Sequence, residues 1–539
     1  MTDPLPERVD LLIFGGQLVD GSGSPAHAGT VASHEGRLHI GPAGWRPEAA
    51  RTIDATGLVV TPGFIDLHSH GGLVVLADPR HEAKVRQGVT TEVIGVDGNG
   101  YAPFAHRDDL LAFVELNAGL DGRPPLAYDW DTVAAYLDRY DRGQAVNVAV
   151  LVGNSALRIG AIGWGEAAAD EQALASMRAM LREAMEDGAF GLSSGLDYPP
   201  GSYASTEELA ALTNEAARLG GFYHTHVRYP LGDRFLDPFR EALEIGRLGQ
   251  GGVHVTHFYH RQTHPGPPEA LLAIVDEAVA AGRDVTFDTY PYEWASTRLL
   301  IQLPQWIQAD GPAALKQRLA DRAARERIRR ELAARGAAYA SAAGWSDVRL
   351  GGFTHPDNLR WESRSLADVM DATGTDAVDV ICDLLLAENL GVAQVTTGPW
   401  TDGLRRFLAH PGAMIGTDST FLGERPSPRT YGSYPRVLGQ FVREEALLSL
   451  EDAVRRMTGA PAARLGLAER GLLRDGFAAD LVVLDPARVR AMATYDDPRR
   501  FPEGIEHVVV NGTLVIDGGT HTGATPGRAL RRGAPTSRP

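Results

Sequence analysis

Cysteine and lysine are almost absent from this chain of 539 residues, which contains one of the former and two of the latter. The single cysteine, Cys382, cannot form an intrachain disulfide, and this fits the reducing environment of the cytoplasm. It lies in the apolar stretch 377–386, where a buried and inert thiol is expected. The two lysines are Lys84 and Lys316, so arginine supplies nearly all of the positive charge.

Long hydrophobic runs are also missing. No apolar run approaches the ~18 residues of a membrane span, and residues 1–10 contain no signal-peptide core. The formal net charge of −17 argues against a nucleic acid or an anionic membrane as the partner. We therefore expect a cytoplasmic protein that acts on a small molecule, and the sequence leaves its oligomeric state open.

Short apolar strands alternate with alanine-rich amphipathic helices through the middle of the chain. This alternation is typical of βα units around a parallel sheet. The strand-like runs end near Leu67, Gly95, Val152, Ser193, Thr225, Thr256, Asp288 and Thr417. Eight such units predict an α/β fold, a (β/α)8 TIM-like barrel, with its chemistry at the carboxyl ends of the strands.

Both ends of the chain consist instead of short strands separated by glycine turns, and Asn511-Gly512 is a hairpin signal between two of them. We expect these ends to pair as one small β-sandwich domain. The predicted divisions are 1–60 and 471–522 for this domain, 61–470 for the barrel, an insertion at about 297–371, and a tail at 523–539. The insertion is either a lid over the barrel mouth or a peripheral elaboration.

Side chains that can bind a metal follow several of the predicted strands. His68 and His70 follow the first strand two residues apart, so both imidazoles leave it in the same direction. The other candidates at strand ends are Asp97, His226, His257 and Asp418. Each histidine alone has an ordinary structural explanation, but four imidazoles and two carboxylates at one face of a barrel favour a metal site.

These ligand types also indicate the chemistry. Imidazole nitrogen and carboxylate oxygen suit Zn²⁺, with Mn²⁺, Co²⁺ or Fe²⁺ as other options. Such an ion lowers the pKa of a bound water and polarises a substrate carbonyl. A carboxylate beside the water can accept its proton and pass it to a leaving amine. Asp418, on the last strand, is the expected acid/base, and the alternative is that it only ligates the metal.

Longer motifs carry a family resemblance that runs over nearly the whole chain. They are PGFIDLHSH at 62–70, QGVTT at 87–91, GAFGLSSGL at 188–196, YPPGSYA at 198–204, THVR at 225–228, YPY at 290–292, GTD at 416–418, and RG at 470–471 with Gly476 and ADL at 479–481. Together they resemble the amidohydrolase superfamily, and within it the N-acyl-D-amino-acid deacylase (D-aminoacylase) group. This resemblance implies a zinc enzyme that removes an acyl group from the nitrogen of a D-amino acid.

The resemblance also implies how the ligands divide. His226 and His257 would hold the tighter ion. Asp97 stands where the group has a bridging cysteine, so a carboxylate would take that place, and the harder oxygen can shift the metal preference. A second position, weaker or vacant, would be lined by His68, His70 and Asp418.

The substrate contacts implied by the resemblance lie on Tyr198, Tyr290, Ser296 and Arg429. Arg429 is the natural partner for a substrate carboxylate through bidentate pairing, and the alternative is an ordinary surface arginine. The expected pocket is partly rebuilt, because three positions depart from the group. Tyr259 replaces a lysine, Asn154 replaces a histidine after the third strand, and Ser427 replaces a histidine before Pro-Arg.

Other interpretations of the chain stay open. A cyclic amide hydrolase of the hydantoinase, dihydroorotase or imidase type uses a carboxylated lysine at the end of strand four, where this chain has none. That absence argues against a lysine bridge but not against a cyclic amide substrate. Residues 191–195 match the G-x-S-x-G of serine hydrolases, but the prolines that follow do not suit the helix this motif needs. A D-dipeptidase, a nucleobase-type deaminase and a non-enzymatic barrel are the remaining alternatives.

Overall fold

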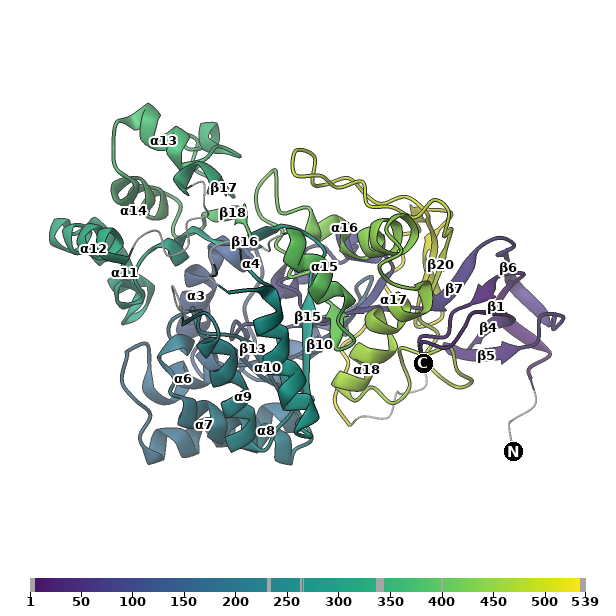
Figure 1. The fold of residues 1–539 in the computed structure, drawn as a ribbon. Coiled ribbons are helices and arrows are strands. Elements are labelled where there is room, and N and C mark those ends of the chain that lie inside the picture. Colours follow the sequence, from purple (N-terminus) through teal and green to yellow (C-terminus); the bar gives the residue numbers. More distant parts are fainter. Residues whose placement is uncertain are drawn as a thin grey trace.

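The structure is a computed structural model that describes residues 5–229, 234–261, 264, 266–335, 344–398 and 401–533. A central barrel separates two smaller parts at opposite ends of the molecule (Figure 1). One part is a β-domain built from both ends of the chain, and the other is an insertion before the last barrel strand. No helix in the described ranges is long and apolar enough to cross a membrane.

The barrel has the eight parallel strand positions that the sequence predicted. They are β8 (Phe64–Asp66), β9 (Val89–Ile94), β10 (Asn147–Val150) continued by β11 (Val152–Gly153), β12 (Gly191–Gly195), β13 (Phe222–His226), β14 (Val253–Val255), β15 (Val285–Thr289) and β19 (Ala413–Ile415). Successive positions pair in parallel from β8 to β19. Nearly all of their residues are buried, which explains why their apolar residues run continuously rather than alternate.

Helices follow the strands and cover the barrel (Figure 1). They are α1 (Gly72–Ala77), α2 (Glu82–Val85), α3 (Arg107–Leu116), α4 (Ala118–Asp121), α5 (Val133–Tyr140), α6 (Asn154–Ile162), α7 (Glu171–Glu186), α8 (Thr206–Arg218), α9 (Asp237–Gly249), α10 (Pro268–Ala280), α15 (Thr401–Ala409), α16 (Arg429–Arg436), α17 (Leu450–Met457) and α18 (Gly459–Leu465). Side-chain caps set where several of them begin. The Asp170 carboxylate, for example, accepts a hydrogen bond of 2.8 Å from the amide of Ala173 at the start of α7.

The β-domain joins the two ends of the chain in one sheet. Its seven strands are ordered β23 (Thr520–His521), β22 (Thr513–Asp517), β21 (Ile505–Val510), β20 (Leu481–Leu484), β7 (Val59–Pro62), β2 (Gln17–Leu18) and β3 (His27–Ala28). A second sheet consists of β5 (Arg37–Gly41), β4 (Thr30–His34), β1 (Arg8–Phe14) and β6 (Glu48–Asp54). Asn511 and Gly512 form the turn between β21 and β22, both with positive φ, as the hairpin signal predicted.

Residues 523–533, which the sequence assigned to a tail, lie against the barrel instead. The Leu530 amide donates to Val148 O at 2.8 Å, and the Gly527 amide donates to Gln144 O at 2.7 Å. Leu530 is buried. A glycine allows this contact, because a Cβ at Gly527 would lie 2.1 Å from Val146 O. The remaining tail positions, 534–539, lie outside the described residues.

The insertion has a sheet and a core of its own. Its sheet is β16 (Trp294–Arg298), β18 (Ala393–Thr397) and β17 (Arg349–Gly351), and its helices are α11 (Gly311–Ala320), α12 (Arg322–Arg335), α13 (Leu366–Thr373) and α14 (Ala377–Ala387). We propose 294–397 as its bounds, because β16 and β18 pair directly; residues 336–343 lie outside the described part. Cys382 on α14 is fully buried, and burial raises the pKa of its thiol to about 12, as suits an inert thiol.

Candidate metal centre

The six predicted ligands lie together at the carboxyl end of the barrel, and all are buried. Their nitrogen and oxygen atoms form two groups in which every donor atom is within 4.8 Å of the others. One group is His68, His70, Asp97 and Asp418, and the other is Asp97, His226 and His257. Asp97 therefore belongs to both.

Asp97 Oδ2 is the common point of the two groups. It lies 3.3 Å from His68 Nε2 and 3.6 Å from His70 Nε2. On its other side, it lies 3.6 Å from His226 Nδ1 and 3.7 Å from His257 Nε2. One carboxylate thus faces four imidazoles, which is the arrangement required of a group shared by two cation positions.

The outer nitrogen of each histidine faces a second polar side chain. The pairs are His70 Nδ1 with Asp121 Oδ1 at 2.7 Å, His226 Nε2 with Asp197 Oδ2 at 3.1 Å, His257 Nδ1 with Tyr229 Oη at 3.1 Å, and His68 Nδ1 with Asp288 Oδ1 at 3.4 Å. Partners of this kind fix the orientation and the tautomer of a metal-binding imidazole. The four inner nitrogens are thereby left pointing at Asp97.

These outer partners were not predicted from the sequence. Asp288 ends a predicted strand and Asp197 follows the fourth strand, so their positions were a usable signal. Asp121 lies on α4 and Tyr229 lies in a loop, and nothing in their sequence context points to the site.

Backbone strain is concentrated on the ligands. Asp97, His257 and Asp418 have φ values of 53°, 32° and 46°. A side chain in this left-handed region carries a conformational cost, which the surrounding structure must offset. Three such residues among the six candidate ligands indicate that the arrangement of these side chains is held in place against local preference.

The charges of the site favour a bound cation. Burial acts to raise the pKa of Asp97, but His68 and the other histidines outweigh it and hold that pKa well below its usual range. Burial acts in the opposite direction on His68, yet Asp97, Asp418 and Asp288 raise its pKa to about 10. A positive charge close to Asp97 therefore offsets the carboxylates, and a divalent ion would supply such a charge.

The ring nitrogens of His68 also favour a bound cation. Both ring nitrogens of His68 are buried, and neither makes a hydrogen bond with any described residue. Buried nitrogens in that state need an explanation, and a bound metal ion is one of the standard explanations. Imidazole and carboxylate donors at these positions fit Zn²⁺.

Arg429 and Tyr290 lie beside Asp418. Arg429 is fully buried, its Nη1 is 2.9 Å from Asp418 Oδ2, and its Nη2 donates to Ser296 O at 3.1 Å. The guanidinium carbon stacks 4.4 Å from the centre of the Tyr290 ring. Arg429 Nε and Tyr290 Oη make no hydrogen bond with the described residues. Two buried donors on these residues are thus without an acceptor among the described residues.

The other expected substrate contacts are more varied. The Tyr198 ring packs 4.9 Å from the His226 ring, and its hydroxyl hydrogen-bonds with Thr297 Oγ1 at 3.0 Å. Tyr259 packs 5.7 Å from Tyr290 and 5.9 Å from His257. Asn154 donates to Gly201 O at 3.0 Å and so supports the loop after β12.

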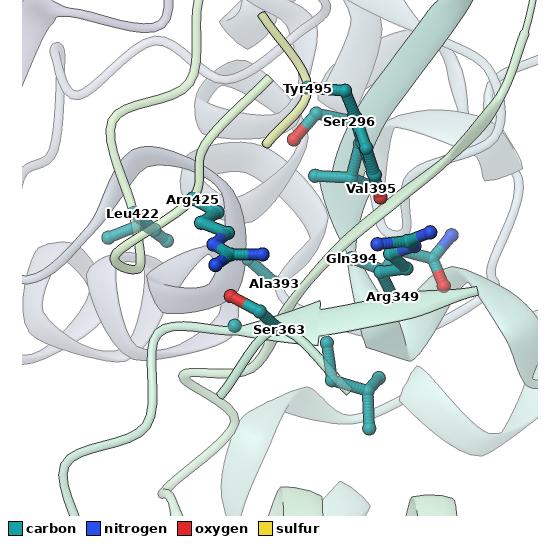
Figure 2. A pocket seen from close by; sticks show the side chains of 11 residues that line it. Ser296, Arg349, Ser363, Ala393, Gln394, Val395, Leu422, Arg425 and Tyr495 are labelled. Atoms are coloured by element: carbon teal, nitrogen blue, oxygen red, sulfur yellow. The ribbon is translucent and has the colours of Figure 1, made fainter. Parts of the chain in front are cut away.

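The insertion forms one wall of the site, because Ser296 and Thr297 belong to β16. Ser296 also borders a small cavity of about 10 Å³ between the insertion sheet and the loop after β19. Figure 2 shows Arg425 and Ser363 on one side of this cavity and Arg349 on the other. A cavity of that size holds about one water and is too small for a substrate.

The geometry argues against a serine hydrolase and against a metal centre bridged by a carboxylated lysine. Ser193 of the G-x-S-x-G stretch is fully buried and donates to Gly95 O at 2.5 Å, and a turn follows its strand instead of a helix. It therefore lacks the exposed elbow of a serine hydrolase. Neither lysine belongs to a ligand group, since Lys84 bonds with Asp66 and Lys316 pairs with Glu115.

Known proteins resemble this chain over most of its length. A family model described as "Amidohydrolase family" matches residues 51–516. N-acyl-D-aspartate deacylase from Alcaligenes xylosoxydans xylosoxydans is 34% identical, over 98% of this chain and 97% of that protein.

Two solved structures are also similar. N-acyl-D-glutamate deacylase from Bordetella bronchiseptica, crystallised with zinc and a phosphonate that mimics the tetrahedral intermediate, has a TM-score of 0.82 and 33% identity. A D-aminoacylase structure, from work on the role of its binuclear metal centre, has a TM-score of 0.81 and 31% identity. Each match covers 97% of this chain and 100% of the other. Zinc and a binuclear centre in these proteins agree with a donor set that divides into two groups around Asp97.

Proposed function

The chain belongs to the amidohydrolase family, as a metal-dependent amidohydrolase of the D-aminoacylase type, and from that membership we propose that it hydrolyses the amide bond of N-acyl-D-amino acids. The observation that carries the proposal is the shared Asp97 carboxylate, which faces four imidazoles at the catalytic end of a barrel. N-acyl amino acids with a free carboxylate are the substrate class that best fits the rest of the site.

His226, His257 and Asp97 would hold the first ion, and His68, His70 and Asp418 would line a second position with Asp97 shared between them. Zn²⁺ is the proposed metal. A zinc ion bound there supplies Lewis acidity toward the amide carbonyl and toward the attacking water. The outer partners Asp121, Asp197, Asp288 and Tyr229 keep the imidazoles directed inward.

Asp418 is the proposed acid and base. Its Oδ2 is held by Arg429, whereas its Oδ1 lies 3.4 Å from both His68 Nε2 and His70 Nε2. Oδ1 is therefore placed to accept a proton from the water that attacks the carbonyl carbon. The same carboxyl group then gives that proton to the amide nitrogen as the C–N bond breaks, and the products are a carboxylic acid and a free amine.

Arg429 and Tyr290 are the proposed contacts for the α-carboxylate of the substrate. Arg429 Nε and Tyr290 Oη are buried donors without an acceptor among the described residues, and a carboxylate offers acceptors to both. This contact would place the substrate's amide bond beside Asp418, because Arg429 already touches that residue. Tyr198 and Ser296 would border the remainder of the substrate, and Tyr259 takes the place of a cationic contact.

The side chain and the acyl group remain to be assigned by experiment. The relatives named above act on N-acyl-D-aspartate and N-acyl-D-glutamate, so acidic substrates belong in the first panel. The test is a hydrolysis panel of N-acetyl and N-formyl D- and L-amino acids, with hydantoins, cyclic imides and D-dipeptides, using zinc-loaded and metal-free protein. We expect release of free D-amino acid by the zinc-loaded protein alone. Turnover confined to the cyclic amides would contradict the proposal.

A further inference from the structure

The first and last strands of the barrel meet without a regular ladder. β8 and β19 do not pair as a ladder, and Ser69 and Ser419 form an isolated parallel bridge between the two chain segments. Two backbone hydrogen bonds accompany it, from the Asp418 amide to His68 O at 2.8 Å and from the His70 amide to Ser419 O at 3.2 Å. Yet these segments carry His68, His70 and Asp418, which must be aligned to within a fraction of an ångström to share a metal. Buried side chains reinforce this junction between the β8 and β19 segments, which we call the seam.

Asp66 joins the two sides of this seam through hydrogen bonds. Its Oδ1 accepts hydrogen bonds from the amides of His68 at 3.1 Å and Thr417 at 3.0 Å. Its Oδ2 accepts a hydrogen bond of 2.6 Å from Thr417 Oγ1. One carboxylate thus binds the residue that precedes Asp418 on one strand and the backbone of His68 on the other.

Lys84 completes the arrangement from α2. It is fully buried, and its Nζ donates to Asp66 Oδ2 and, at 2.6 Å, to Thr417 Oγ1. Glu92 Oε2 lies 3.8 Å from the same Nζ and accepts a hydrogen bond of 2.7 Å from Ser69 Oγ. The ammonium therefore contacts groups that belong to both sides of the seam. A fully buried lysine requires such partners, because an unpaired ammonium would not stay charged in the protein interior.

We propose that Lys84 is a positioning residue for the second metal position, and that it acts by locking the segment of His68 and His70 to the segment of Asp418. This inference rests on the proposed function of those residues as ligands. The lock does not extend to the first position, since His226 and His257 come from β13 and β14 on other barrel segments. Loss of Lys84 should therefore weaken one position and spare the other.

The experiment measures the two positions separately. Zinc and cobalt are titrated into metal-free wild type, Lys84→Met and Lys316→Met, with stoichiometry from elemental analysis and Co²⁺ absorption as the spectroscopic readout. Lys316 is the matched control, because it is the other lysine of the chain and pairs from α11 of the insertion with Glu115 on α3, away from the seam. For Lys84→Met we expect a Kd for the second ion that is about 10–100-fold weaker, and a Kd for the first ion within about twofold of wild type. Lys316→Met should match wild type at both.

A double variant with unchanged net charge tests whether misfolding explains the result. Lys84→Met leaves Asp66 and Glu92 without their cation, whereas Asp66→Asn with Lys84→Met removes one charge of each sign and keeps an acceptor for the two amides. This double variant should fold and still bind the second ion weakly, because it lacks the ammonium that contacts Asp66, Thr417 and Glu92 together. Wild-type affinity for both ions in either variant, or equal weakening of both, would overturn the inference. These titrations need no substrate, so they stay informative if the hydrolysis panel contradicts the proposed reaction.

Discussion

Asp97→Asn is the sharpest perturbation of the metal centre, because it removes one charge and almost no volume. The carboxylate lies 3.3–3.7 Å from four ligand nitrogens. At an effective dielectric constant of about 20, its attraction to one positive charge at that range is about 5 kcal/mol. Since about 1.4 kcal/mol corresponds to a tenfold change in an equilibrium constant, zinc affinity should fall by roughly three orders of magnitude. Both positions should be affected, because Asp97 belongs to both.

The assay is competition with a chelator of known zinc affinity, followed by hydrolysis measurements at saturating zinc. Asp288→Asn is an informative comparison, because Asp288 faces the outer nitrogen of His68 at 3.4 Å and should cost only about 10–100-fold. Asp284→Asn is the surface control, since Asp284 is exposed and pairs with Arg464. If Asp97→Asn bound zinc as tightly as wild type, or if Asp288→Asn were the more damaging change, the assignment of Asp97 as the shared ligand would be refuted.

The remaining predictions concern the proton, the substrate and the scaffold. Asp418→Asn should lower kcat by at least about 100-fold while the His226 and His257 position keeps its metal, because the amide cannot accept the proton; full activity in this variant would exclude the acid/base role. Arg429→Ala should raise KM selectively for substrates with a free carboxylate, and an equal rise for amide-capped substrates would count against the carboxylate contact. Asp170→Ala should lower the free energy of unfolding by about 1 kcal/mol through loss of the α7 cap. Its thermal midpoint checks this, and an unchanged midpoint would show that the cap contributes nothing.

The carboxyl ends of the barrel strands could be predicted, because a buried parallel strand has a recognisable pattern in the sequence. Each strand is buried on both faces, so it is an apolar run in the sequence, and the first polar side chains after it lie at the catalytic end. His68, Asp97 and Asp418 were proposed as ligands in this way. Their mutual distances, and the sharing of Asp97 between two groups, depend on the tilt of the barrel strands and became visible only in the structure.

Other contacts could not be predicted, because they depend on segments that are distant in sequence. Asp121 reaches His70 from α4, and Arg429 reaches Asp418 from the start of α16. Nothing in the sequence around Lys84 indicates a role at the site, yet Lys84 lies fully buried at the seam between β8 and β19. The composition of residues 523–533 suggested a tail, whereas backbone hydrogen bonds to the barrel hold that segment in place. Polar composition does not reveal pairing of this kind.

The central claim is that a metal held around Asp97 drives the hydrolysis of N-acyl-D-amino acids. The most direct measurement is the release of free amino acid from paired N-acetyl-D- and N-acetyl-L-amino acids, by protein stripped of metal and then titrated with zinc. We expect no turnover without metal, turnover of the D-substrates that rises with the first equivalent of zinc, and little or no turnover of the L-substrates. Turnover that survives complete removal of metal, or a preference for the L-substrates, would contradict it.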